Sequence, residues 1–520
     1  MSIEKNKFEL FTNPVIPGFY PDPSICRVKN NYYLVTSSFT YYPGIPIFKS
    51  TDLVNWKQIG YVLSRKEQLD LSGLGHSLGI FAPTIRYFKE RFYVICTNVG
   101  KEGNFIVSST RPESGWSDPI WLEGAEGIDP SLFFDDEKCY YTGTRGIKNG
   151  KYFGHNEIWL QEFDYENMKL VGEQYILWEG ALKDTKWPEG PHIYKKDGWY
   201  YLMISEGGTG HFHALTIARS KNIKSRFKGY EGNPILTHRH LGVSYPIANV
   251  GHGDLVKTQN DEWWMILLAS RPYGGYYRNL GRETFLAPVI WENDWPVISP
   301  GSGRVEFEYK YPNLPKGNKD SENIYDDFDN SNLKLVWNFL KTPIGDFWSL
   351  DSRKGFLRLK LKQEKLKDLD NPSFLGVRQR HMSYKARTII EFEPEFDSES
   401  AGIVLLQSNE YFYKFEISKE KNNNVIRVIK CEKGVEEELK SCICNNRRIE
   451  LIINANKQDI CFSFINNNIE STLIDKVNGR ILSTDVAGGF VGTYIGLFAS
   501  GNGINSDNYV DFDLFEYKSI

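Results

Sequence analysis

Asp22-Pro23-Ser24-Ile25, followed by the aromatic pair Tyr32-Tyr33, is the first of five copies of one sequence pattern. Each copy has an anchor, a short apolar run, a polar turn and an aromatic pair. The other copies run from Ala82-Pro83 to Phe92-Tyr93, from Asp129-Pro130 to Tyr140-Tyr141, from Glu189-Gly190-Pro191 to Tyr200-Tyr201, and from Gly253-Asp254 to Trp263-Trp264. Successive anchors, counted from Pro23, lie 60, 47, 61 and 63 residues apart. This spacing predicts five four-stranded blades of a β-propeller.

Three of the five anchors carry an acidic residue at or next to the same place in the repeat: Asp22, Asp129 and Glu189. The first strand of each blade lines the central channel, so equivalent positions on different blades face one another. We therefore expect the three carboxylates to converge. Singly, an Asp before Pro is a common turn starter, and a Glu is often part of a surface salt bridge. Three acids gathered together would repel one another and lose hydration, and such a cost usually marks a functional site.

The bulk composition excludes some classes of function. A net charge of −4 and a pI near 6.2 offer no basic footprint for a polyanion, which argues against a nucleic-acid partner. Aromatic residues make up 14% of the chain. Most of them are expected to pack blade against blade, and a minority at the channel mouth would offer stacking faces for sugar rings.

The lack of a recognisable signal peptide and the spread of the cysteines predict a cytoplasmic protein. Residues 1–7 contain no apolar core of signal-peptide length, and no later run is long enough to span a bilayer, so no membrane partner is expected. The 7 cysteines are an odd number and widely spread, which favours reduced thiols over a disulfide framework. Cys442 and Cys444 lack a second ligand pair, so a zinc site is not expected.

A change in sequence character predicts a domain boundary. The stretch 315–321 is polar and has no periodicity, and we place the propeller at residues 1–316 and a second domain at residues 317–520. From residue 326 onward, short apolar strands alternate with Asn, Lys and Gly turns, which indicates a β-sandwich of the jelly-roll kind. The sandwich has no catalytic constellation, so its expected role is support, homo-oligomer contact or sugar binding.

Carboxylates that face each other across a sugar-sized gap are typical of glycoside hydrolysis. One protonates the leaving oxygen, and the other activates water or attacks the anomeric carbon. A third carboxylate would raise the pKa of the acid through its like charge. His252 lies at the fifth anchor and would be either a core histidine or the holder of a water or cation on the channel axis. Arg282 would be a channel-mouth cation beside the carboxylates or a surface partner of Glu283.

The motifs resemble glycoside hydrolase family 43 in order along the whole first domain, and together they are highly specific. The matching stretches are residues 13–24 (NPVIPGFYPDPS), 82–86 (APTIR), 127–133 (GIDPSLF), 189–192 (EGPH) and 280–284 (LGRET). The second domain resembles the accessory sandwich of the β-xylosidase and α-L-arabinofuranosidase members. This resemblance implies an all-β protein with a five-bladed propeller and an inverting mechanism. It also implies that Asp22 is the general base, Glu189 the general acid and Asp129 the modulator of the acid's pKa.

The resemblance implies further site residues. Arg282 matches a family arginine near the base and the substrate. His252 matches a channel histidine that in some members supports a calcium ion or a water, so a structural calcium is an option although no cofactor is required. Phe39 and Phe81 match aromatic positions that line the pocket for the terminal sugar. The β-xylosidase group typically has Trp at the second of these positions, so the Phe in Gly79-Ile80-Phe81-Ala82-Pro83 leaves the sugar preference open.

The expected activity is therefore that of an exo-acting β-1,4-xylosidase. It would release xylose from the non-reducing end of short xylo-oligosaccharides, and arabinofuranose from arabinoxylan fragments. One alternative is an enzyme that is mainly an α-L-arabinofuranosidase. A second is a sugar-binding propeller without catalysis, which predicts that one of the acids is replaced, whereas all three are present. A third is a fructosyl-transferring propeller enzyme, which would retain the anomeric configuration.

Overall fold

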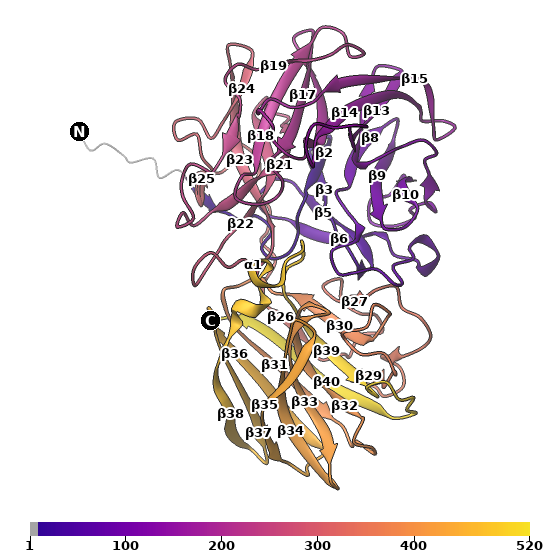
Figure 1. The fold of residues 1–520 in the computed structure, drawn as a ribbon, viewed down its shortest axis with the longest axis vertical. Helices are drawn as coiled ribbons and strands as arrows, with labels where there is room; N and C mark the ends of the chain where they lie inside the picture. Colours follow the sequence, from indigo (N-terminus) through magenta and orange to yellow (C-terminus); the bar gives the residue numbers. More distant parts are fainter. Residues whose placement is uncertain (1–8) are drawn as a thin grey trace, which may run out of the picture.

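The computed structural model describes residues 9–520, and residues 1–7, discussed above for targeting, lie outside the described residues. Two domains made almost wholly of β-strands are stacked along the long axis of the molecule (Figure 1). The all-β class, the five-bladed propeller and the following β-sandwich are confirmed. Within residues 9–520, no helix has the length and apolar character needed to cross a bilayer.

Each blade of the propeller is an antiparallel sheet built from one continuous stretch of the chain. Blade 1 consists of β2 (Ser24–Val28), β3 (Asn31–Val35), β5 (Gly44–Ser50) and β6 (Lys57–Leu63). Blade 2 consists of β8 (Thr84–Phe88), β9 (Arg91–Val99), β10 (Gly103–Ser109) and β11 (Ile120–Trp121), with β7 (Gly79–Ile80) also paired to β9. Blade 3 consists of β12 (Ile128–Asp135), β13 (Lys138–Gly146), β14 (Asn156–Asp164) and β15 (Lys169–Trp178).

The last two blades follow the same plan. Blade 4 consists of β16 (Glu189–Lys196), β17 (Trp199–Glu206), β18 (Ala214–Ser220) and β19 (Lys228–Gly229), with β20 (Leu236–Thr237) also paired to β18. Blade 5 consists of β21 (Ala248–Lys257), β22 (Trp263–Ser270), β23 (Glu283–Glu292) and β24 (Trp295–Ile298). In every blade the aromatic pair of the sequence repeat lies in the second strand, next to the hairpin turn.

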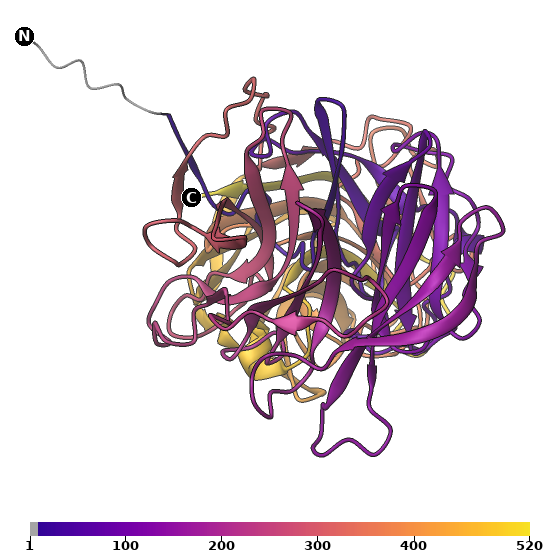
Figure 2. The same cartoon turned by 90° about the horizontal axis from the view of Figure 1, so that it is seen from above.

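The first strands β2, β8, β12, β16 and β21 contact their neighbours around the propeller axis. In Figure 1 the five blades fan out around this axis, and Figure 2 shows the molecule turned by 90°, from the side away from the sandwich. A buried polar network ties these five strands together. Arg86 on β8 binds Asp254 on β21 over 2.9 Å and donates to Nδ1 of His192 on β16 over 3.0 Å. Ser24 on β2 donates to Asp254, and the hydroxyl of Ser131 on β12 lies 3.3 Å from the same nitrogen of His192. The floor of the channel is thus a fixed, hydrogen-bonded ring.

The N-terminal segment closes the propeller. Strand β1 (Leu10–Thr12) pairs with β25 (Glu308–Lys310), beyond blade 5. The side chain of Asn13 donates to the carbonyls of Leu286 and Glu306 and accepts from the amide of Leu286. These contacts hold blade 5 against the start of blade 1, where a cluster of buried apolar residues fills the space between the two blades.

The sandwich consists of two eight-stranded sheets. One contains β26 (Ile324–Asp326), β28 (Trp348–Ser349), β29 (Leu357–Lys360), β31 (Ser383–Glu391), β36 (Arg448–Asn456), β37 (Asp459–Asn466), β38 (Ile469–Asn478) and β40 (Tyr509–Ser519). The other contains β27 (Asn338–Leu340), β30 (Ser373–Arg378), β32 (Ser400–Ser408), β33 (Tyr411–Glu420), β34 (Asn423–Glu432), β35 (Val435–Ile443), β39 (Tyr494–Ser500) and, from the propeller, β4 (Tyr41–Tyr42).

The two domains share this second sheet, because β4 of the propeller pairs with β27 of the sandwich. The ring of Tyr41 stacks on that of Tyr494 with centroids 3.7 Å apart. Short helical turns complete the chain: η1 (Lys66–Gln68) in the propeller, and η2 (Gly479–Leu482) and α1 (Thr484–Ala487) in the sandwich. The predicted boundary at residues 316 and 317 falls between β25 and β26. After α1 the chain reaches the propeller, and that contact forms part of the site described next.

Candidate active site

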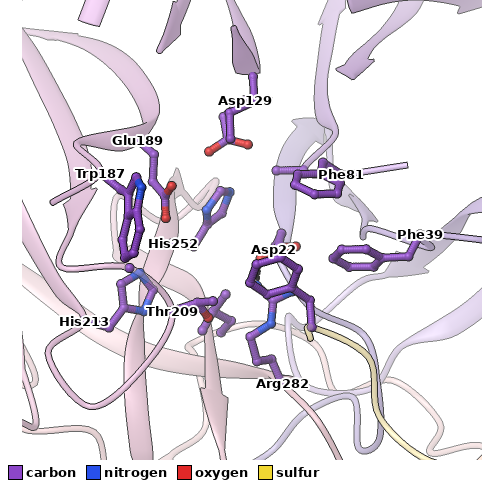
Figure 3. A pocket seen from close by; sticks show the side chains of 15 residues that line it. Asp22, Phe39, Phe81, Asp129, Trp187, Glu189, Thr209, His213, His252 and Arg282 are labelled. Atoms are coloured by element: carbon purple, nitrogen blue, oxygen red, sulfur yellow. Dashed lines mark hydrogen bonds and ion pairs between the residues drawn. The ribbon is translucent and has the colours of Figure 1, made fainter. Parts of the chain in front are cut away.

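A cavity of about 300 Å³ lies at the end of the channel where the first strands begin (Figure 3). The three acidic anchors all line it, so the convergence expected from the repeat is present. Among the described residues, the lining comes from the propeller with one exception, Phe490 of the sandwich. The full set is Asp22, Phe39, Phe81, Ala82, Ile128, Asp129, Trp187, Glu189, Gly208, Thr209, His213, His252, Leu268, Arg282 and Phe490.

Asp22 is held at both carboxylate oxygens. Oδ1 accepts a hydrogen bond of 2.6 Å from Nη1 of Arg282, and Oδ2 accepts one of 2.6 Å from the hydroxyl of Ser37. The residue is 5% exposed and has a left-handed backbone with φ of 54° just before β2. This conformation costs energy in a residue other than glycine and turns the side chain out of the regular strand direction. Asp22 is therefore a fixed carboxylate on one side of the cavity.

Asp129 and Glu189 lie on neighbouring blades at irregular points of their strands. The pairing of β12 with β13 shifts register between Ile128 and Ser131, and that of β16 with β17 shifts between Glu189 and His192. Such bulges redirect side chains and are frequent next to active sites. The amide of Gly190 donates to Oδ2 of Asp129 over 3.0 Å, so the residue after one acid fixes the other acid.

The surroundings set the two carboxyl groups apart in proton affinity. Burial raises the pKa of Asp129 to about 6 against the opposing effect of His252, and the charge of Asp22 adds to the rise. Burial also raises the pKa of Glu189 well above its usual range, and the charges of Asp129 and Asp22 add to it, against the effect of Arg282. Glu189 therefore keeps its proton to higher pH than an exposed glutamate does.

Arg282 belongs to the site and not to a surface pair with Glu283. It is 8% exposed, and its guanidinium lies 5.7 Å from the ring centroids of both Phe39 and Phe490. Glu283 is fully buried and instead binds Arg271 through two hydrogen bonds of 2.7 and 2.8 Å. The surface-pair alternative is therefore wrong. Arg282 compensates the charge of Asp22, and Glu283 pairs with Arg271 in the interior of the propeller.

Three phenylalanines form one aromatic wall of the cavity. Phe39 lies 5.1 Å from Phe81 and 6.0 Å from Phe490 between ring centroids, and Phe81 lies 6.0 Å from Phe490. Phe490 reaches this wall from the sandwich because its amide donates to the hydroxyl of Ser77 over 2.9 Å. The preceding Gly489 has φ of 74°, and a Cβ there would lie 2.2 Å from Oγ of Ser77. The sandwich thus completes the pocket, a role that its sequence did not indicate.

Other lining residues also escaped the sequence analysis. Trp187 lies on the connection from blade 3 to blade 4, and Thr209 and His213 lie on the loop between β17 and β18 of blade 4 (Figure 3). Trp187 packs over Gly208, where a Cβ would lie 2.6 Å from the indole ring. The run Trp187-Pro188-Glu189 next to an anchor, and the run Gly207-Gly208-Thr209 at the end of β17, were the available signals. Loop residues of this kind carry no repeat pattern, and only the fold assigns them to the pocket.

His252 also lines the pocket, and its ring lies against Gly190, where a Cβ would be 3.0 Å from the imidazole. Within residues 9–520, no group of three or more His, Cys, Asp or Glu side chains is arranged to hold a metal ion. On the channel floor, the donor Arg86 requires Nδ1 of His192 to accept, so Nε2 of His192 carries the proton and cannot bind a metal. Among the described residues, protein side chains alone therefore do not supply three ligands for a calcium ion. A calcium ion supported by His252 through water stays a prediction, and no step below uses one.

The arrangement offers a carboxyl group with a raised pKa, an oriented carboxylate and an aromatic wall around one cavity. Figure 3 shows Glu189 and Asp22 across the cavity from each other, with Asp129 beside them. A sugar bound between them would meet a proton donor on one side and a proton acceptor on the other. This is the set of groups that acid–base hydrolysis of a glycosidic bond requires.

Comparison with known proteins finds similarity through both domains. The sequence profile of glycosyl hydrolases family 43 matches residues 11–296, and that of a β-xylosidase C-terminal concanavalin A-like domain matches residues 325–518. A Butyrivibrio fibrisolvens protein named xylosidase/arabinosidase is 47% identical over 516 residues, 98% of this chain and 99% of that protein. A non-reducing end α-L-arabinofuranosidase of Bacteroides ovatus is 38% identical over 518 residues, 98% and 95% of the two chains. The crystal structure of a xylan β-1,4-xylosidase from Bacillus halodurans matches with a TM-score of 0.92 at 32% identity, covering 98% of this chain and 100% of that one.

Proposed function

This chain belongs to glycoside hydrolase family 43, and we propose that it is an inverting, exo-acting β-1,4-xylosidase that also accepts α-L-arabinofuranosides. Its substrates are short xylo-oligosaccharides and arabinoxylan fragments, which lose their terminal sugar at the non-reducing end. One observation carries the proposal: Glu189, with a raised pKa, stands across one cavity from Asp22, which Arg282 and Ser37 orient.

In the proposed mechanism, Glu189 is the general acid and protonates the glycosidic oxygen as the bond to the anomeric carbon breaks. Asp22 is the general base and takes a proton from the water that attacks the opposite face of that carbon. Asp129 is a positioning residue that keeps the pKa of Glu189 high through its charge. The attack from the opposite face inverts the configuration, so the first product from a β-xyloside is α-xylose.

The shape of the cavity supports action at a chain end. The aromatic wall of Phe39, Phe81 and Phe490 borders a volume of about 300 Å³, which suits one terminal sugar and part of the next. A binding propeller without catalysis has no need for the raised pKa of Glu189. A mainly arabinofuranosidic specificity is the second candidate, supported by the names of the two relatives above, a xylosidase/arabinosidase and an α-L-arabinofuranosidase. Phe81 leaves the sugar preference open.

The test is the release of 4-nitrophenol from the β-D-xylopyranoside and the α-L-arabinofuranoside, for the intact protein and for Glu189→Gln. Turnover of either glycoside that is lost in the variant supports the proposal, and the ratio of the two rates decides the preferred sugar. Proton NMR of the first sugar released from the xyloside distinguishes α-xylose from β-xylose. A β product, or no turnover of either glycoside by folded protein, would refute the proposed mechanism.

A further inference from the structure

His213 is a buried histidine on the cavity wall that the mechanism above does not use. It directly precedes β18, is 1% exposed, and lies beside Trp187 and Thr209 (Figure 3). Its Nδ1 is 2.8 Å from the backbone carbonyl oxygen of Asn249. A carbonyl oxygen can only accept a hydrogen bond, so Nδ1 carries the proton. Burial lowers the pKa of His213 to about 4, so at neutral pH Nε2 is a bare acceptor.

This acceptor is buried, and no hydrogen-bond partner within residues 9–520 satisfies it. The ring also has no freedom to turn the nitrogen away. A Cβ on Gly251 would lie 2.1 to 2.4 Å from three atoms of the imidazole, so the ring packs directly on that glycine. Asn249 is itself held in place by the hydroxyl of Tyr276, which donates to Oδ1 over 2.7 Å. An unpaired buried acceptor is costly, and one kept rigid in a pocket wall indicates a ligand group that completes it.

We propose that Nε2 of His213 accepts a hydrogen bond from one hydroxyl group of the sugar in the pocket, which makes His213 a specificity-determining residue. This inference rests on the proposed function. Elsewhere in the lining of the cavity, the hydroxyl of Thr209 and Nε of Arg282 are also buried without partners among the described residues, so the cavity offers donors as well as this acceptor. A sugar hydroxyl both donates and accepts, and it fits between such groups. A site built to pair a hydroxyl rejects analogues that lack it.

Two substitutions separate the two nitrogens of the ring. His213→Asn keeps a donor close to Nδ1 for the carbonyl of Asn249 and removes the acceptor at Nε2. His213→Gln places an amide oxygen close to Nε2 and restores the acceptor. Each is assayed with the 4-nitrophenyl glycoside that the intact protein cleaves faster and with its three monodeoxy analogues. Thermal melting shows whether each variant is folded.

Removal of one particular hydroxyl from the substrate is expected to lower the kcat/KM of the intact protein. This loss should be about tenfold larger than the loss that the same removal causes in His213→Asn, because only the intact protein pairs that hydroxyl. His213→Gln should recover most of the lost discrimination. A purely structural role predicts instead that both variants slow all four substrates by the same factor. Equal sensitivity of the intact protein and His213→Asn to every deoxy substitution would overturn the inference, while turnover lost in Glu189→Gln would still support the proposed function. Failure of the intact protein to cleave any parent glycoside would remove both.

Discussion

Nη1 of Arg282 lies 2.6 Å from Oδ1 of Asp22, and the two side chains are 9% and 6% exposed. The hydroxyl of Ser37 occupies the other oxygen of Asp22, so this carboxylate is both charge-compensated and oriented. A buried carboxylate that loses such a partner is left with an uncompensated charge. The pair of Arg282 and Asp22 therefore stabilises the site and also orients the proposed general base.

Arg282→Gln should lower kcat/KM by about 100-fold or more, because the base loses its orienting donor and the sugar loses a cation. The measurement is steady-state kinetics on both nitrophenyl glycosides. Arg282→Lys is the matched variant: it retains the charge but not the planar fork of donors, and intermediate activity is expected. Near-native kcat/KM in Arg282→Gln would show that Asp22 does not depend on this pair.

Asp129→Asn should move the alkaline limb of the kcat/KM profile to lower pH. The charge of Asp129 helps to raise the pKa of Glu189, so its removal lets Glu189 lose its proton earlier as the pH rises. The asparagine retains an oxygen for the amide of Gly190, which limits structural damage. The pH dependence of kcat/KM for the two proteins tests this point, and an unshifted alkaline limb would count against a modulating role.

The same substitution should stabilise the fold at neutral pH. The folded pKa of Asp129 is about 6 and its unfolded pKa about 4, so the folded state binds more protons between these values, and its stability falls as the pH rises through them. At pH 7 this difference between the folded and unfolded pKa corresponds to about 2–3 kcal/mol of unfolding free energy, which Asp129→Asn would recover. Below pH 4 the two proteins should melt alike.

Asp135, a second aspartate on β12, is the control for the sign of this effect on stability. Burial acts to raise the pKa of Asp135, but the hydrogen bonds from Lys195 and Tyr200 outweigh it and the net pKa is lowered. Asp135→Asn should therefore destabilise the protein at neutral pH, opposite to Asp129→Asn. Melting curves from pH 4 to pH 8 compare the two variants, and equal signs would contradict the assignment of a raised pKa to Asp129.

Phe490→Ala should raise KM by about tenfold, because the sandwich would no longer supply its part of the aromatic wall. The control is Phe396→Ala, at a residue of the same domain that is 63% exposed and does not line the cavity. Initial rates over a range of substrate concentrations separate KM from kcat. If both variants behave like the intact protein, the sandwich contributes support alone.

The architecture was accessible from the sequence because it repeats. Each anchor, turn and aromatic pair recurs at a nearly constant interval, and a propeller converts equal positions in the repeat into neighbours around one axis. That logic predicted that Asp22, Asp129 and Glu189 share a cavity, which the structure confirms. The catalytic roles stay predictions that the experiments above address.

Residues outside the repeat could not be predicted in the same way. Phe490 reaches the pocket from a domain that begins after the propeller ends, and its place depends on how the two domains pack. His213 and Thr209 lie on a blade 4 loop whose course follows from local contacts. Arg282 had two interpretations, and its bond to Asp22 together with the burial of Glu283 against Arg271 decided between them. Packing between distant segments was the missing information in each case.

The most direct test of the central claim, that Glu189 is the general acid, is the dependence of rate on the leaving group in Glu189→Ala. Xylobiose has a poor leaving group that needs protonation, whereas a 2,4-dinitrophenyl xyloside does not. The variant should lose at least about 1,000-fold in kcat/KM on xylobiose but no more than about tenfold on the activated xyloside, within the usual range for acid catalysis. Equal losses on both substrates would contradict the assignment of Glu189 as the acid.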